Sequence, residues 1–177
     1  TAQNPTIASA TAAMGGVYTL TVTASGCTAT ATTSVTVNPL PTPTAANTGP
    51  YCAGQTISLT ATGGGTYSWT GPGGFTSTSA TPTRPASTVA MSGVYTVTVT
   101  SAAGCTATAT TSVTVNPLPT PTITPLSSTT FCEGDSLVLL SSPDLFYSWS
   151  AGSVDSTQTV HSGGDYSVTL TNVYNCS

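Results

Sequence analysis

Apolar and polar residues alternate with a period of two along most of the chain. Residues 95–100, for example, place one tyrosine and two valines on one face and three threonines on the other. Such alternation is typical of half-buried antiparallel strands, and no stretch keeps the three-and-four spacing of an amphipathic helix. The pattern predicts strands over residues 56–62, 66–70, 94–100 and 107–115.

The chain contains an internal repeat. Residues 16–43 and 93–121 are nearly identical, and residues 51–69 match residues 131–149, where a Trp follows a Cys by 17 positions in both. Short strands separated by Gly and Pro turns, in a unit of about 80 residues, predict an all-β protein of antiparallel β-sandwiches. We expect three units: a partial repeat with only its last strands, a complete repeat, and a third repeat without its last strand, at 1–38, 39–116 and 117–177.

Charged residues make up only 3% of the 177 residues, against roughly 25% in a typical domain. One Arg and no Lys cannot neutralise phosphates, so the composition excludes a nucleic-acid binder and a polybasic membrane anchor. No stretch approaches the roughly 20 apolar residues of a membrane-spanning helix. Residues 1–132 hold no Asp, Glu, Lys or His, which argues against acid–base catalysis. Instead the chain has 41 Thr and 23 Ser, and Thr favours strands.

The aromatic residues fit a sandwich of the immunoglobulin (Ig) type. Trp69 and Trp149 fall on the strand that buries a Trp in such sandwiches, and Tyr18, Tyr95 and Tyr166 fall where a tyrosine corner lies. We expect all five in the core. An exposed platform on which sugars stack is the alternative.

The repeated motifs are C-x-G-x-x-(I/L), Y-S-W, G-x-Y-(T/S)-V-T-(V/L), G-C and S-V-T-V-N-P. They resemble the bacterial Ig-like/PKD-like tandem repeats of large secreted adhesins and of gliding-type, type IX-secreted surface proteins. The resemblance implies an extracellular, tandem, non-enzymatic module without a cofactor. PKD-type domains often carry an acidic turn after the Trp. Here residues 70–74 read T-G-P-G-G, without the Asp of a calcium ligand.

Five cysteines among strands indicate an oxidising, extracellular setting. One bridge per repeat would pair Cys52 with Cys105 and Cys132 with Cys176, leaving Cys27 over. In an Ig-type sandwich, however, these partners lie at opposite poles about 17 Å apart, whereas a disulfide needs Cα atoms within about 7 Å. If the repeats are arranged head to tail, the end of strand F in one repeat would lie near the start of strand B in the repeat before it, which would pair Cys52 with Cys176. Cys27, Cys105 and Cys132 would then pair with neighbouring repeats or chains. We favour this inter-repeat pairing slightly, and both stay open. A metal site is not expected, because no C-x-x-C pair occurs.

Pro-rich segments at 38–43 and 116–121 join the repeats, either as polyproline II spacers or as edge strands. We interpret the incomplete first and third repeats as part of a longer chain, with strand donation between subunits as the alternative.

All five acidic residues lie in the third repeat, and we interpret them as solvated loop charges: Glu133, Asp135, Asp144, Asp155 and Asp165. A weak calcium site at the last three is the alternative.

His161, Ser162 and Asp165 resemble the residue types of a hydrolase triad, but no G-x-S-x-G elbow accompanies them. Ser136 and Ser156 fit an Asp-Ser/Thr-apolar pattern of bacterial O-glycosylation.

These features together predict a structural extracellular protein, a segment of a surface filament, stalk or adhesin shaft. Its expected partners are further copies or neighbouring repeats. The alternative is a module that binds carbohydrate or a cell surface through inter-strand loops such as 63–65 and 72–75. No enzyme activity, nucleic acid, membrane insertion or cofactor is expected.

Overall fold

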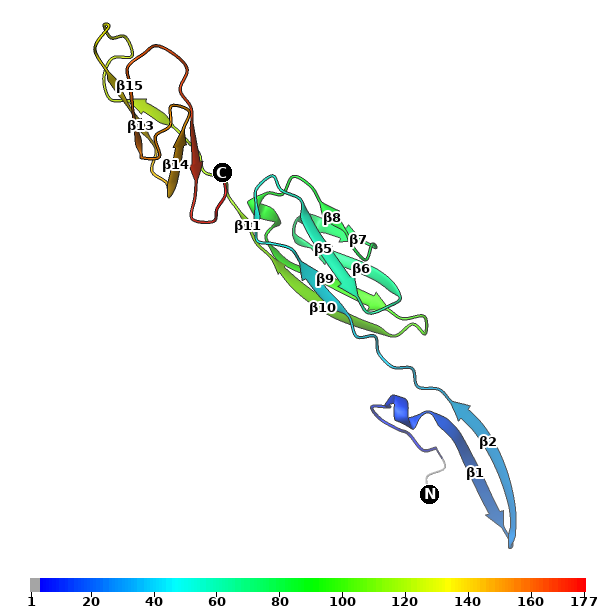
Figure 1. The fold of residues 1–177 in the computed structure, drawn as a ribbon. Helices are drawn as coiled ribbons and strands as arrows, with labels where there is room; N and C mark the ends of the chain where they lie inside the picture. Colours follow the sequence, from blue (N-terminus) through cyan, green and yellow to red (C-terminus); the bar gives the residue numbers. More distant parts are fainter. Residues whose placement is uncertain (1–3) are drawn as a thin grey trace.

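The computed structural model describes residues 4–177 and is all-β, as the alternating pattern predicts. Three parts follow one another along an elongated molecule (Figure 1). We call them the N-terminal hairpin (residues 16–35), the central sandwich (44–116) and the C-terminal sandwich (123–176). Within the described residues, no helix is long and apolar enough to cross a membrane.

The central sandwich consists of two facing antiparallel sheets and one short parallel pair. One sheet has the order β10-β9-β6-β7 and the other the order β3-β5-β8, while β11 pairs in parallel with β4. The strands are β3 (Thr44–Asn47), β4 (Tyr51–Cys52), β5 (Ile57–Thr62), β6 (Thr66–Gly71), β7 (Phe75–Ser77), β8 (Thr83–Arg84), β9 (Gly93–Thr100), β10 (Thr106–Val113) and β11 (Val115–Asn116). Two 3-10 turns, η2 (Pro72–Gly74) and η3 (Val89–Met91), lie between them.

This strand order is that of an Ig sandwich. With β5, β6, β8, β9 and β10 as strands B, C, E, F and G, one sheet reads A-B-E and the other C′-C-F-G. The last expected strand, 107–115, is interrupted at Thr114: β10 ends at Val113, and β11 then leaves β9 to pair with β4. The other three predicted strands correspond to β5, β6 and β9 within one residue.

The core of the central sandwich lies between its two sheets. Tyr95, Val97 and Val99 of β9 are fully buried, and they pack in one cluster with the apolar face of β5 and with Trp69 of β6. The threonines that alternate with these residues do not contribute to the core. The period-two pattern therefore corresponds directly to an inner and an outer face.

The C-terminal sandwich repeats this arrangement with fewer strands. Its sheets are β12-β13-β15 and β14-β16, made of β12 (Ile123–Pro125), β13 (Leu137–Ser141), β14 (Phe146–Trp149), β15 (Thr157–Val160) and β16 (Val168–Thr171). In the part of the chain that the structure describes, β16 pairs with β14 alone, so its other edge is open. The core is correspondingly small, with four residues in its buried cluster.

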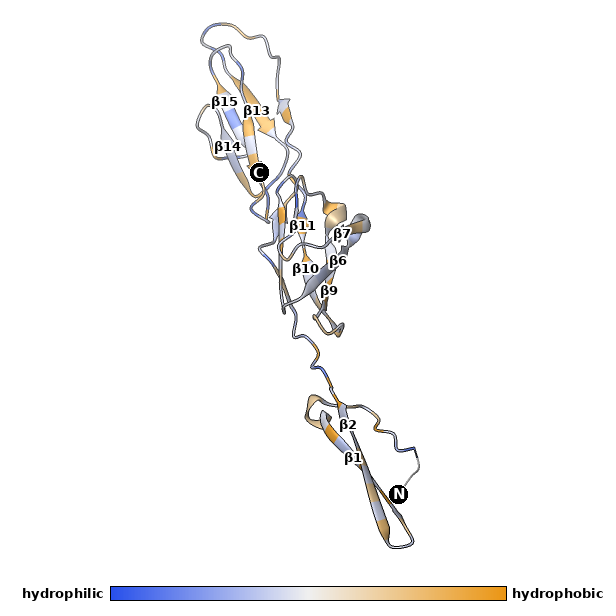
Figure 2. Ribbon diagram, turned by 90° about the vertical axis from the view of Figure 1, so that its right-hand side faces the viewer, coloured by the Kyte–Doolittle hydropathy of each residue, from blue (hydrophilic) through white to orange (hydrophobic). Residues whose placement is uncertain are grey.

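The N-terminal hairpin consists of β1 (Gly16–Ala24) and β2 (Cys27–Val35), preceded by the 3-10 turn η1 (Ala12–Met14). Its register matches that of β9 with β10, because Tyr18 faces Thr33 as Tyr95 faces Thr111. Every residue of the two strands is nevertheless exposed. Figure 2 shows apolar positions along β1 with no second sheet over them.

The Pro-rich segments lie outside the strands, apart from Asn116, which ends β11. Residues 36–43 form no strand, and β3 begins at Thr44, after the last proline. Residues 117–122 likewise separate β11 from β12. The prolines of both segments therefore lie in connections between strands rather than in edge strands.

Candidate functional site

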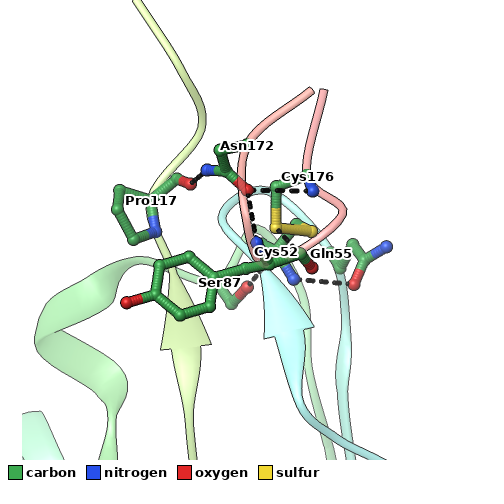
Figure 3. The surroundings of a disulfide bond; sticks show 7 residues. Cys52, Gln55, Ser87, Pro117, Asn172 and Cys176 are labelled. Atoms are coloured by element: carbon green, nitrogen blue, oxygen red, sulfur yellow. Dashed lines mark hydrogen bonds between the residues drawn. A yellow bond between two sulfur atoms is a disulfide. The ribbon is translucent and has the colours of Figure 1, made fainter. Parts of the chain in front are cut away.

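The junction between the two sandwiches contains a disulfide bond between Cys52 and Cys176 (Figure 3). The two Cα atoms are 5.6 Å apart, although 124 positions separate the residues in the sequence. Cys52 ends β4 of the central sandwich, and Cys176 follows β16 of the C-terminal sandwich. This is the inter-repeat pairing, and it excludes the alternative bonds Cys52–Cys105 and Cys132–Cys176 in this structure.

Chain direction explains why the two sandwiches, rather than one, supply the cysteines. Because β6 is antiparallel to β9 and follows β5 through a reversal, β5 and β9 run the same way. The turn before β5 and the turn after β9 consequently lie at opposite poles. Only the turn after the equivalent strand of the next sandwich, β16, reaches Cys52.

Hydrogen bonds hold the turn that carries Cys52. The amide of Cys52 donates to the side-chain oxygen of Gln55 at 2.9 Å, and the hydroxyl of Ser87 donates to the Cys52 carbonyl at 3.2 Å. The amide of Ala53 donates to the Asn116 carbonyl at 2.9 Å. Cys52 is thereby fixed against the residue at which the linker begins.

Asn172 organises the other side of the junction. Its side-chain oxygen accepts hydrogen bonds from the amides of Tyr174 and Cys176, at 3.0 and 3.1 Å. Its side-chain amide donates to the carbonyl of Pro117 at 2.8 Å (Figure 3). One side chain therefore shapes the turn that carries Cys176 and attaches this turn to the linker. Nothing in the sequence pattern singled out Asn172, because its role depends on contacts 55 residues away.

The other three cysteines are free. Cys27 and Cys132 are exposed, and Cys105 is half-buried, with its sulfur 3.8 Å from the carbonyl oxygen of Asn38. Within the described residues, no group of three or more His, Cys, Asp or Glu side chains could hold a metal ion.

The expected core aromatics fall into two groups. Trp69, Trp149 and Tyr95 are buried, and each indole nitrogen donates to a backbone carbonyl at 3.0 Å. Tyr166 is half-buried and packs at the edge of the smaller core. Tyr18 is exposed, contrary to the expectation, because no second sheet from residues 4–177 packs over the N-terminal hairpin.

All three tyrosines form the same tyrosine corner. The hydroxyls of Tyr18, Tyr95 and Tyr166 each donate to the carbonyl of the residue four positions earlier, at 2.7, 3.0 and 2.9 Å. This hydrogen bond is local, so it forms whether or not the ring is buried.

The position of Ser162 also argues against a triad with His161, because the hydroxyl of Ser162 lies 3.4 Å from the hydroxyl of Tyr166.

Arg84, the single basic side chain, has a structural role that the sequence did not indicate. Its guanidinium donates to the carbonyl of Pro72 at 2.7 Å and to the hydroxyl of Tyr95 at 3.0 Å. It also lies over the ring of Phe75, 5.5 Å from the centroid. Arg84 therefore fastens the 72–75 loop to the tyrosine corner. This attachment makes that loop less suited to adapt to a ligand.

The acidic residues of the C-terminal sandwich remain dispersed. Four of them are exposed: Glu133, Asp135, Asp155 and Asp165. Asp144 is half-buried and accepts a hydrogen bond from the amide of Leu145 at 2.9 Å. The two candidate glycosylation positions, Ser136 and Ser156, are both exposed.

Comparison with known proteins finds no matching protein family and no matching curated sequence. Among solved structures, an amphioxus IgVJ-C2 molecule is 22% identical to this chain, with a TM-score of 0.38. The match covers 59% of this chain and 63% of the amphioxus chain. Murine CEACAM1b is 17% identical with a TM-score of 0.40, covering 75% and 93%. Three domains of the bacteriophage RB49 outer capsid protein Hoc are 20% identical with a TM-score of 0.37, covering 73% and 52%. The Ig-type strand order described above rests on the hydrogen bonds of this chain itself.

Proposed function

We propose that this chain is a structural segment of an extracellular filament, stalk or adhesin shaft, built of Ig-like units that disulfide bonds link end to end. In this proposal the units divide near residues 38 and 116. The observation that supports it is the Cys52–Cys176 bond, which joins the successive sandwiches covalently where only a short linker would otherwise connect them. A disulfide at this place resists pulling on the chain and requires an oxidising compartment.

The junction has the features of a mechanical connection rather than of a ligand site. Asn172 and Ser87 donate hydrogen bonds to the carbonyls of Pro117 and Cys52, and Gln55 accepts one from the amide of Cys52, so the polar groups around the disulfide are satisfied. Within the described residues, no buried side-chain nitrogen or oxygen lacks a hydrogen-bond partner. The covalent bond and the Asn172–Pro117 contact together restrict how the two sandwiches pivot about residues 117–122.

The low charge of the surface favours lateral association. A formal net charge of −4 over 177 residues produces little repulsion between neighbouring rods. Exposed threonines on strands supply hydroxyl groups that can form hydrogen bonds between neighbours.

A binding role through the inter-strand loops is the second candidate. The 63–65 loop is exposed and consists of three glycines, so its backbone is accessible to a carbohydrate or a cell-surface partner. Gly65, however, is held against the carbonyl of Thr100 so closely that any Cβ there would collide with it. Packing against Thr100 therefore explains the glycine at position 65 without a ligand, and this favours the structural role over the binding role.

Small-angle X-ray scattering of the purified monomer, with the Cys52–Cys176 bond formed, tests the proposal. We expect one extended particle, and a broader distribution of distances for the double variant Cys52→Ala/Cys176→Ala, whose sandwiches can pivot. Cys105→Ala, which leaves the disulfide intact, is the matched control and should scatter like the wild type. Identical scattering from the double variant would show that the disulfide does not set the shape and would contradict the proposed mechanical role.

Electron microscopy of native material separates the two candidate functions. Uniform fibres with a repeat near the length of one subunit support the structural role. Isolated rods that bind a glycan or cell surface, and lose this binding when the 63–65 loop is replaced, support the adhesin.

A further inference from the structure

The cysteines of this chain occur in two kinds of turn. The first kind precedes strand B and contains Cys52 or Cys132. In both turns the amide three residues after the cysteine donates to the cysteine carbonyl at 3.1 Å. The glycine two residues after the cysteine has a left-handed φ, +89° at Gly54 and +94° at Gly134. Cys132 therefore lies in the same turn as the disulfide-bonded Cys52.

The second kind of turn follows strand F and contains Cys27, Cys105 or Cys176. Cys176 and Cys105 share one conformation, in which the residue four positions earlier donates its amide to the cysteine carbonyl, at 3.0 and 2.8 Å. Cys27 occupies the same position in the repeat, but in a tighter turn, where it pairs with Ala24 at the tip of the hairpin. The observed disulfide joins one cysteine of each kind, from successive units.

The two exposed free cysteines lie at opposite ends of the molecule. Cys27 lies at the tip of the β1–β2 hairpin, which points away from the central sandwich (Figure 1). Cys132 precedes β13 and lies at the pole opposite Cys176, because β13 and β16 run the same way as β5 and β9 do. Cys105, in contrast, lies within the molecule, beside the linker residue Asn38.

We propose that Cys132 of one copy forms a disulfide with Cys27 of a second copy placed head to tail, which repeats the Cys52–Cys176 bond between molecules. This inference rests on the proposed structural function and identifies a partner for it, a second copy of this chain. Each end presents the kind of cysteine that the other end requires. Residues 16–35 carry no charge, so Glu133 and Asp135 beside Cys132 meet no repulsion there.

The bond forms by thiol–disulfide exchange with a low-molecular-weight disulfide such as oxidised glutathione. The thiolate of one cysteine attacks this disulfide and releases one reduced glutathione, and the second cysteine then displaces the other. Two protein thiols become one disulfide, and one oxidised glutathione becomes two reduced molecules. Both protein thiols are exposed, as the exchange requires.

Oxidation of the full chain with glutathione, followed by non-reducing electrophoresis, tests the inference. The wild type should form a ladder of covalent dimers and longer species that reductant abolishes. Cys27→Ala and Cys132→Ala should each stay monomeric, whereas an equal mixture of the two should form dimers and nothing longer. Cys105→Ala, the matched control, should form the ladder of the wild type.

Three results would overturn the inference: dimers from either single variant alone, loss of the ladder in Cys105→Ala, or no dimer from the mixture. Melting curves that match the wild type show that each variant is folded. Scattering data on the monomer separate this inference from the proposed function. A rigid monomer without a ladder refutes the intermolecular bond and leaves the structural role intact, whereas a flexible monomer refutes that role.

Discussion

Tyr95 shows how a single residue connects the local and the tertiary structure of a unit. Its ring is fully buried against the core, its hydroxyl donates to the Met91 carbonyl, and the same hydroxyl accepts from Arg84. Tyr18 makes the equivalent local hydrogen bond with its ring exposed. The two tyrosines therefore form a matched pair in which burial is the main difference.

We expect Tyr95→Phe to destabilise the central sandwich by about 1–2 kcal/mol, because it leaves the half-buried Met91 carbonyl and one N–H of Arg84 without a partner. Tyr18→Phe should change stability by less than about 0.5 kcal/mol, since water replaces the lost hydroxyl. Chemical denaturation followed by tryptophan fluorescence measures the effect in the central sandwich, and hydrogen exchange measures the effect in the N-terminal hairpin, which contains no Trp. Equal losses in the two variants would refute this role of burial.

Arg84 provides a second prediction at this scale. Arg84→Met keeps most of the aliphatic stem but removes the hydrogen bonds to Pro72 and Tyr95, and we expect a loss of about 2 kcal/mol. Thr83→Ala, at the exposed neighbouring position, is the control and should be nearly neutral. A neutral Arg84→Met would show that the guanidinium contributes nothing to holding the 72–75 loop.

At the scale of elements, β1 and β9 show that nearly identical strands can differ completely in burial. Tyr18, Leu20 and Val22 are 39, 64 and 54% exposed, whereas their equivalents Tyr95, Val97 and Val99 are 0% exposed. The pairing within each hairpin is the same, so the difference comes from the neighbours of β9: β6 pairs with its other edge and β5 packs across it, whereas among residues 4–177 β1 pairs with β2 alone.

This difference predicts that the N-terminal hairpin binds apolar probes. The double variant Leu20→Thr/Val22→Thr should lower the fluorescence of a bound hydrophobic dye and leave the melting temperature of the central sandwich unchanged. Val99→Thr, at the buried equivalent of Val22, should instead lower that melting temperature, because it buries a hydroxyl at a cost of about 1–3 kcal/mol. Dye binding that does not change in the double variant would contradict the account of the hairpin.

The comparison of elements also shows how far the sequence could predict this molecule. The alternation around Val97 was sufficient to predict the strands and their inner face, and chain direction was sufficient to favour Cys176 as the partner of Cys52. The exposure of Tyr18 was predicted wrongly, because the expectation followed the strand pattern alone and did not consider that a repeat with only its last strands has nothing to pack across them. The roles of Arg84 and Asn172 were missed because both depend on contacts distant in sequence.

At the scale of the whole molecule, the two sandwiches differ in the size of their cores. Ten buried residues form the central cluster and four form the C-terminal one, where β16 also has an open edge in the described chain. Less buried apolar surface stabilises a sandwich less. The C-terminal sandwich therefore depends more on the junction that attaches it to its neighbour.

We expect hydrogen exchange to be faster in β13, β14 and β16 than in β5, β6 and β9, because local opening requires less free energy where the core is smaller. Reduction of the Cys52–Cys176 bond should accelerate exchange in the C-terminal sandwich and leave the central strands β6 and β9 unaffected. Mass spectrometry of peptides from both states measures this. Faster exchange in the central sandwich would contradict the ranking.

The central claim is that the disulfide joins successive units and not the two poles of one unit. A non-reduced peptide map of the native protein tests it most directly, with pepsin as the protease, because the chain has one Arg and no Lys for trypsin and because acid suppresses thiolate exchange. The account predicts a linked peptide pair that contains Cys52 and Cys176. A pair that contains Cys52 and Cys105 would contradict it.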